Sequence, residues 1–214
     1  MRITEIKTYV LVADNADVSL TSSAQDTILV EIYTDEGIVG YGETDTNPWV
    51  AKALIDSPGT HTMDQSMKDI LIGKDPLNVE ERWEELYIGT AMTGRRGAGV
   101  NAIGAIDMAL WDIKGKYENK PVYQLLGGNV HENITPYASL QPLGSSFEEY
   151  RDSLVEWAEK ARNLGFKAVK SEVTMNGPYA HNGMRENDDK HTLVLEAVRK
   201  ALGSEIKLMV DVQY

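Results

Sequence analysis

The stretch AIGAIDMALWDIKGKYENKPVYQLLGG, residues 102–128, has the clearest periodicity in this sequence. Its apolar residues recur at steps of three and four and are Ala102, Ile103, Ile106, Ala109, Leu110 and Ile113. This spacing places them on one face of an α-helix. Pro121 forbids further helix, and Gly127 and Gly128 follow as a flexible stop. The pattern predicts a buried helix that packs one domain and then leads the chain into another, although an ordinary buried helix would have the same periodicity.

Small residues lie in and just before the same helix, at Gly99, Ala102, Gly104 and Ala105. A position without a large side chain lets a neighbouring backbone come close. We therefore expect another element to approach the helix backbone along these residues.

Upstream of this helix the sequence indicates a small α+β unit. Stretches rich in β-branched residues, separated by polar loops and an Asp-Glu-Gly turn, predict strands over residues 2–13, 27–34 and 38–43. Short connections of this kind are typical of an antiparallel meander. Two helices follow, over 63–72 and from 78 to about 87.

Downstream the pattern changes to alternating strands and helices. We predict strands over 134–140, 166–173 and 207–212, with helices over 146–164 and 189–202 between them. This β-α-β-α-β order is typical of a parallel sheet or barrel. A complete (β/α)8 barrel needs about 250 residues, so residues 129–214 can supply only its first part.

Composition excludes several classes of protein. The chain has 214 residues, no cysteine and a net charge of −12, which argues against nucleic acid as a partner and excludes disulfides and thiolate metal sites. No apolar run approaches the roughly 20 residues of a membrane span, and the N-terminus lacks the apolar core of a signal peptide. We therefore expect a cytoplasmic protein that binds neither nucleic acid nor a membrane.

Polar side chains gather at the ends of two predicted strands. In FKAVKSEV, Lys170 and Glu172 share one face, and in KLMVDVQY, Asp211 and Gln213 share one face. Active sites in α/β barrels and open α/β sheets lie at the C-terminal ends of strands. A lysine, two carboxylates and an amide could thus converge at the C-terminal end of one barrel or sheet. A purely structural lysine–carboxylate pair would give the same pattern.

The sequence AIDMALWDIKGK…PVYQLLGG resembles the signature of the enolase superfamily, in its mandelate racemase and muconate-lactonizing branch. In that family this helix closes an N-terminal α+β capping domain and leads into a modified (β/α)8, or TIM, barrel. The resemblance implies a capping domain over residues 1–128 and the first part of the barrel over residues 129–214, with the rest of the barrel absent from this chain.

The resemblance also implies roles for the strand-end residues. Lys170 matches the first lysine of a Lys-x-Lys pair that moves a proton alpha to a substrate carboxylate, but Glu172 stands in the second place. Either Lys170 acts electrostatically and the base lies elsewhere, or Glu172 tunes Lys170. Asp211 matches the first of three carboxylate ligands for Mg²⁺, and Gln213 stands where relatives often contact substrate.

Loops supply further candidates for substrate binding. The segment 174–187 is long for a connection between a strand and a helix and carries His181 and Arg185, although it could equally be a solvated, mobile loop. In the family, two capping-domain loops determine substrate specificity, and by position these would be residues 14–26 and 44–49. Asn47 and Trp49 are the candidates there, with packing at a helix start as the alternative for Trp49.

The activity that the resemblance implies is an Mg²⁺-dependent acid-sugar dehydratase. The enzyme would remove the proton alpha to a carboxylate, stabilise an enediolate, and expel the beta hydroxyl to give a 2-keto-3-deoxy sugar acid. The alternatives are a racemase, epimerase or cycloisomerase with the same intermediate, and, in another class, a non-catalytic fragment. We also expect a small-molecule sugar acid as substrate and a homo-oligomeric assembly.

The last strands predict how this part of the chain packs. We expect Val169 and Val173, with Val210 and Val212, to pack on the crossover helices, while Met209 faces an interior that later strands would fill. Because exposed apolar surface is unfavourable at about 25 cal/mol per Å², we expect these residues to be part of a longer polypeptide.

Overall fold

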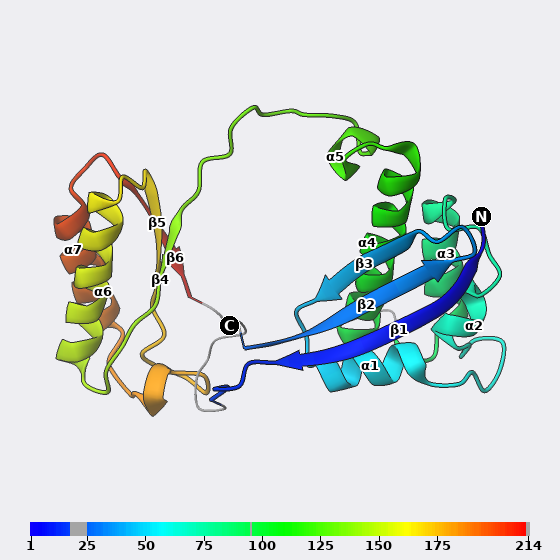
Figure 1. Ribbon diagram of the computed structural model, residues 1–214. Coiled ribbons are helices and arrows are strands. Elements are labelled where there is room, and N and C mark those ends of the chain that lie inside the picture. The colour runs from blue at the N-terminus through cyan, green and yellow to red at the C-terminus, as the bar shows by residue number, and fades with distance from the viewer. Residues whose placement is uncertain (18–24, 95, 213–214) are drawn as a thin grey trace. The chain divides into compact units, whose positions relative to one another are not determined.

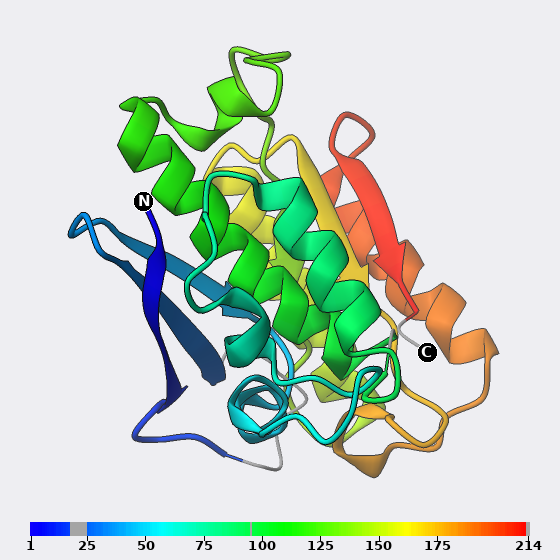
Figure 2. The ribbon, with the colours of Figure 1, turned by 90° about the vertical axis from the view of Figure 1, so that its right-hand side faces the viewer.

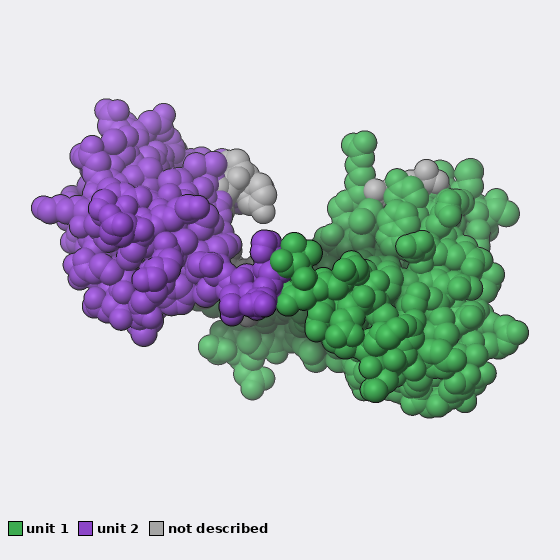
Figure 3. Space-filling view, turned by 90° about the horizontal axis from the view of Figure 1, so that it is seen from above, with its two compact units in different colours: residues 1–130 green, residues 131–214 purple. Residues whose placement is uncertain are grey.

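The computed structural model describes residues 1–17, 25–94 and 96–212 of the chain. Its contacts divide the chain into two compact units, Met1–Val130 and His131–Tyr214, coloured separately in Figure 3. Each unit has its own cluster of buried apolar side chains. The division falls close to residue 128, where the family resemblance implies that a capping domain ends.

The first unit begins with a three-stranded antiparallel sheet in the order β1-β2-β3. Its strands are β1 (Ile3–Val12), β2 (Asp26–Thr34) and β3 (Val39–Thr44). The alternation predicted for β2 is confirmed, because Ile28, Val30 and Ile32 are all fully buried on one face. The expected antiparallel meander is therefore present.

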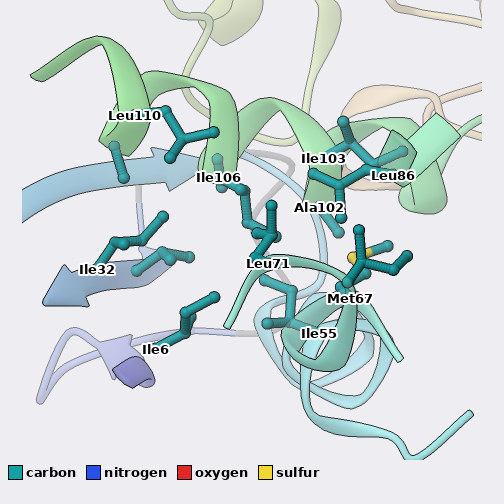
Figure 4. Packing of buried hydrophobic residues seen from close by; sticks show 14 of the residues in the cluster. Ile6, Ile32, Ile55, Met67, Leu71, Leu86, Ala102, Ile103, Ile106 and Leu110 are labelled. Carbon is teal, nitrogen blue, oxygen red and sulfur yellow. The ribbon is translucent and has the colours of Figure 1, made fainter. Parts of the chain in front are cut away.

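Helices pack against this sheet and against one another. They are α1 (Pro48–Asp56), α2 (Met67–Leu71), α3 (Val79–Gly89), α4 (Ala98–Glu118) and α5 (Val122–Leu125). Helices α1 and α4 contact the strands, and α3 runs beside α4 (Figures 1 and 2). Side chains from the sheet and from α1 to α4 meet in one core, where Ile32 of β2, Ile55 of α1 and Ile106 of α4 point toward one another (Figure 4).

The close approach expected along α4 occurs at its alanines. Strand β3 crosses the helix through Gly40 and Gly42, where an added Cβ would lie 2.1 Å from the carbonyl oxygen of Ala109 and 1.9 Å from that of Ala105. Gly104 was expected to take part, and that expectation is wrong. A Cβ at Gly104 would meet no described atom within 4 Å, because each helical residue is rotated about 100° from its neighbour.

Helix α4 ends as its sequence predicts. Asn119 is the C-cap in a left-handed conformation with φ 50°, and the amide of Lys120 donates to the carbonyl oxygen of Gly115. Pro121 follows, where a further helical amide would be needed. The chain then makes the single turn of α5 before the second unit begins.

The second unit is a three-stranded parallel sheet with two crossover helices. Its elements are β4 (Ala138–Leu140), α6 (Phe147–Asn163), β5 (Ala168–Glu172), the 3₁₀ turn η1 (His181–Gly183), α7 (Asp189–Leu202) and β6 (Lys207–Asp211). The strand order is β4-β5-β6, with parallel pairing throughout. Helices α6 and α7 lie together on one side of the sheet (Figure 1). The predicted β-α-β-α-β order is confirmed.

Two details of this unit differ from expectation. The strand predicted over 134–140 is only three residues long, because Pro136 has no amide hydrogen to donate and Ile134 is exposed. Val210 and Val212 were expected to pack on the crossover helices, and they are exposed. The helix-side cluster takes in Leu208 of β6 and does not include these two valines.

Candidate functional site

The second unit presents Lys170, Glu172 and Asp211 on one face of its sheet. Val169 is fully buried with the helices, so its strand neighbours Lys170 and, by alternation, Glu172 belong to the opposite face. Glu172, the last residue of β5, pairs in register with Asp211, the last residue of β6. Parallel strands end at the same edge, so the three charged groups lie together at the C-terminal ends.

Lys170 and Asp211 form an ion pair across the two strands. The Lys170 Nζ lies 2.8 Å from Asp211 Oδ2, and both side chains are half-buried. The hydrogen bond to Asp211 is the main reason that the pKa of Lys170 is raised; desolvation opposes it, and the charges of Asp211, Tyr137 and Glu172 add to it. Lys170 is therefore a stable ammonium group here, which favours an electrostatic role over a role as a free base.

Glu172 is buried and hydrogen-bonded at both its side chain and its backbone. The Thr174 hydroxyl donates to Glu172 Oε1 at 2.8 Å, and the Tyr150 hydroxyl donates to the backbone carbonyl of Glu172 at 3.0 Å. The residue as a whole is 7% exposed. Its carboxylate is thus held in one orientation beside Asp211 instead of moving in solvent.

The loop after β5 is folded onto the unit. The amide of His181 donates to the carbonyl of Thr174 at 2.7 Å, and the amide of Glu186 donates to the carbonyl of Met175 at 3.1 Å. Met175 and Met184 belong to the buried cluster. The alternative of a solvated, mobile loop does not describe residues anchored in this way.

His181 joins this loop to the loop after β4. Its Nε2 lies 2.9 Å from the carbonyl oxygen of Gly144, and its ring contacts the ring of Tyr150 edge-on. A carbonyl oxygen can only accept, so Nε2 carries the proton of this hydrogen bond. Asn182 donates to the same carbonyl at 2.7 Å. Arg185, three residues further along the loop, is exposed.

The two capping-domain candidates belong to the first unit. Asn47 is the N-cap of α1, and its side-chain oxygen accepts from the amide of Val50 at 3.2 Å. Trp49 is in the first turn of α1 and is 57% exposed, so it does not pack at the helix start. Gln213 lies outside the described residues, as does most of the loop 14–26.

The metal-ligand candidates are few. Carboxylate oxygens are the donors that Mg²⁺ prefers, and Asp211 and Glu172 place such donors at neighbouring strand ends. Within residues 1–17, 25–94 and 96–212 no group of three or more His, Cys, Asp or Glu side chains could hold a metal ion. The carboxylate of Asp211 is a donor of the kind that Mg²⁺ prefers.

Sequence reasoning missed two residues at this site, Tyr150 and Thr174. Thr174 was the first residue of the long loop, and only its spacing of two from Glu172 could have marked it. Tyr150 had no such signal, because it reaches the site from α6, 24 positions away from Thr174.

Among residues 1–17, 25–94 and 96–212 no helix is both long and apolar enough to cross a membrane.

The sequence matches one family model, described as the N-terminal domain of mandelate racemase / muconate lactonizing enzyme, over residues 6–127. Curated relatives extend the similarity into the second unit. D-galactarolactone cycloisomerase of Agrobacterium fabrum is 32% identical, and the match covers 100% of this chain and 52% of that protein. Arabinonate dehydratase of Saccharolobus solfataricus is 30% identical, and the match covers 98% of this chain and 53% of that protein.

Solved structures give the same result. The crystal structure of the 3,6-anhydro-D-galactonate cycloisomerase from Zobellia galactanivorans is 31% identical, with a TM-score of 0.75, and the match covers 99% of this chain and 51% of that one. The chain thus spans about half the length of the relatives that it matches.

Proposed function

The chain belongs to the mandelate racemase and muconate lactonizing enzyme family of the enolase superfamily, and from this premise we propose that the protein is an Mg²⁺-dependent sugar-acid dehydratase. The observation that carries the proposal is the convergence of Lys170, Glu172 and Asp211 at one pair of parallel strand ends. A cation beside two carboxylates at that place suits a reaction that removes a proton from an anionic substrate.

Each residue has a separate role in this proposal. Lys170 offers a permanent positive charge to a substrate carboxylate, since its bond to Asp211 favours the ammonium form. Glu172 places a carboxyl group beside them, the kind of group that can accept and return a proton, so in this proposal it exchanges the proton alpha to the substrate carboxylate. Asp211 would hold Mg²⁺, which supplies Lewis-acid stabilisation of the charge that develops on the substrate.

A cycloisomerase is the second candidate, because two of the similar proteins carry that name. It would use the same proton exchange and differ in the fate of the intermediate. A dehydratase expels a hydroxyl group, and its product is lighter than the substrate by one water. A cycloisomerase or epimerase product has the mass of its substrate.

The experiment is to incubate the protein in its natural full length with a set of aldonic and aldaric acids and Mg²⁺, and to analyse products by mass spectrometry and NMR. We expect a 2-keto-3-deoxy acid from at least one substrate. Asp211→Asn should reduce turnover about 100-fold or more, because it weakens an oxygen ligand. Asp152→Asn is the matched control, since Asp152 is an exposed partner of Arg151 on α6. If the products have the same mass as their substrates, the protein is a cycloisomerase or epimerase and the dehydratase proposal is wrong.

We further propose a cytoplasmic homo-oligomer that binds a small sugar acid and neither nucleic acid nor membranes. The net charge of −12 supports the exclusion of nucleic acid, because phosphates repel an acidic surface. Light scattering after size-exclusion chromatography measures the assembly, and a monomer at micromolar concentration would contradict it.

A further inference from the structure

We propose that Thr174 and Tyr150 are positioning residues that fix the carboxylate of Glu172 in its reactive orientation. The inference deepens the proposed function and rests on it in one respect, the role of Glu172 in proton exchange. Neither residue is expected to touch substrate. Their contribution is to hold another group, which they do through a short chain of hydrogen bonds that begins on α6 and ends on the Glu172 side chain.

The chain of bonds begins at the Tyr150 hydroxyl. Tyr150 is fully buried, and its hydroxyl oxygen lies 3.0 Å from the backbone carbonyl of Glu172 and 3.0 Å from the backbone amide of Thr174. It donates to the first and accepts from the second. One rigid side chain therefore clamps the backbone on both sides of Val173, at the point where the chain leaves β5.

The clamp decides where the Thr174 hydroxyl points. With the backbone fixed at residues 172 and 174, the Thr174 Oγ1 comes to lie 2.8 Å from Glu172 Oε1 and donates to it. Thr174 is 6% exposed and Glu172 is 7% exposed, so water has little access to replace this donor. A hydrogen bond shielded from water is stronger, and the loss of its donor leaves a buried oxygen unsatisfied.

Pairing of the strands does not require this side-chain bond. Beyond Glu172 the backbone amide of Val173 donates to the carbonyl of Asp211 at 3.0 Å, which continues the contact between the strands. The Thr174 hydroxyl therefore acts on the Glu172 side chain and not on the sheet. A valine at position 174 would keep the shape and the burial and remove the hydroxyl, which bonds Glu172 and also interacts with the Tyr150 hydroxyl.

The test compares Thr174→Val with Thr174→Ser in the natural full-length protein. Thr90→Val is the matched control, because Thr90 is equally buried and its hydroxyl donates to the backbone carbonyl of Leu86 in the other unit. For each variant we would measure kcat and KM on the best sugar acid, the melting temperature, and the position of the Glu172 carboxylate in a crystal structure.

We expect Thr174→Val to lower kcat about 10- to 100-fold with KM changed less than about twofold, because misplacement of a reacting group acts on the chemical step. Its carboxylate should leave the position seen here. Thr174→Ser should retain that position and recover most of kcat, and Thr90→Val should keep wild-type kcat.

The inference is overturned if the Glu172 carboxylate of Thr174→Val stays in place, or if kcat of Thr174→Val falls no further than that of Thr90→Val at equal melting temperature. A wild-type protein that converts none of the acids would refute the proposed function instead. In that case the crystallographic comparison alone decides whether Thr174 positions Glu172.

Discussion

Single residues set the closest packing in the first unit. Gly40 and Gly42 of β3 face the backbone of α4, and both contacts are with carbonyl oxygens of the helix. Backbone atoms on both sides cannot rotate away as a long side chain could. The small residues of α4 predicted that another element approaches the helix. The partner glycines lie on β3, with Gly42 63 residues before Ala105 and Gly40 69 residues before Ala109, and the local sequence pattern could not pair them.

Gly42→Ala tests this packing. We expect it to lower the free energy of unfolding by about 3 kcal/mol or more, because the new methyl group would lie 1.9 Å from the Ala105 oxygen unless the strand and helix separate. Gly104→Ala is the control on α4 itself. It meets open space and should raise stability by about 0.5–1 kcal/mol, since alanine is the better helix former. Urea unfolding measures both, and equal effects of the two would contradict the packing described here.

Elements of the first unit are also tied by a charged cluster at Asp56. Its carboxylate lies 2.5 Å from Lys52 Nζ on α1 and 2.7 Å from Lys68 Nζ on α2, and it accepts from the Thr8 hydroxyl on β1. Burial, the largest single influence, raises the pKa of Asp56, but the bonds from Lys52, Lys68 and Thr8 together outweigh it and leave the pKa lowered. Three elements are thus joined at one carboxylate.

The lowered pKa of Asp56 predicts a pH dependence. A carboxyl group with a folded pKa below its unfolded value of about 4 stabilises the protein above that pH, and the contribution is lost as the pH falls through the folded pKa. We expect Asp56→Asn to cost about 1 kcal/mol at pH 7, a modest value because the cluster is partly solvated. The difference from wild type should narrow below about pH 4. A difference that is constant down to pH 2 would show that the charge of Asp56 is not responsible.

Local pattern explains which elements the sequence could predict. The alternation of Val30 and Ile32 predicts β2, and the capping box of Ser146 with Glu149 predicts the start of α6, because each signal lies within a few residues. The sequence did not predict α1 as a separate helix, because Asn47 and Pro48 mark its start but no clear apolar stripe follows them. The Tyr150–Thr174 contact depends on how α6 packs on β5, which no local pattern encodes.

At the scale of the whole molecule the two units differ in how their sheets are covered. The core of the first unit is built from its own residues, from Ile3 of β1 to Ile113 of α4, across sheet and helices. In the second unit the helices cover one side of the sheet, while Val210 and Val212 at its last strand are exposed. Lys170, Glu172 and Asp211 lie on the other side. The sequence could place these three together because strand alternation and parallel order need no tertiary detail.

This difference predicts different behaviour of the units when each is expressed alone. Residues 1–130 should fold cooperatively, with near-ultraviolet circular dichroism and a sharp melting transition, because the buried cluster described for this unit is built from side chains between Ile3 and Ile113. Residues 131–214 should bind a hydrophobic dye and aggregate, because apolar side chains at the end of β6 have no cover within that unit. Gly42→Ala introduced into residues 1–130 should lower their melting temperature, which ties the transition to the packing of β3 on α4. The prediction is contradicted if residues 1–130 expressed alone are unfolded while residues 131–214 expressed alone are well folded.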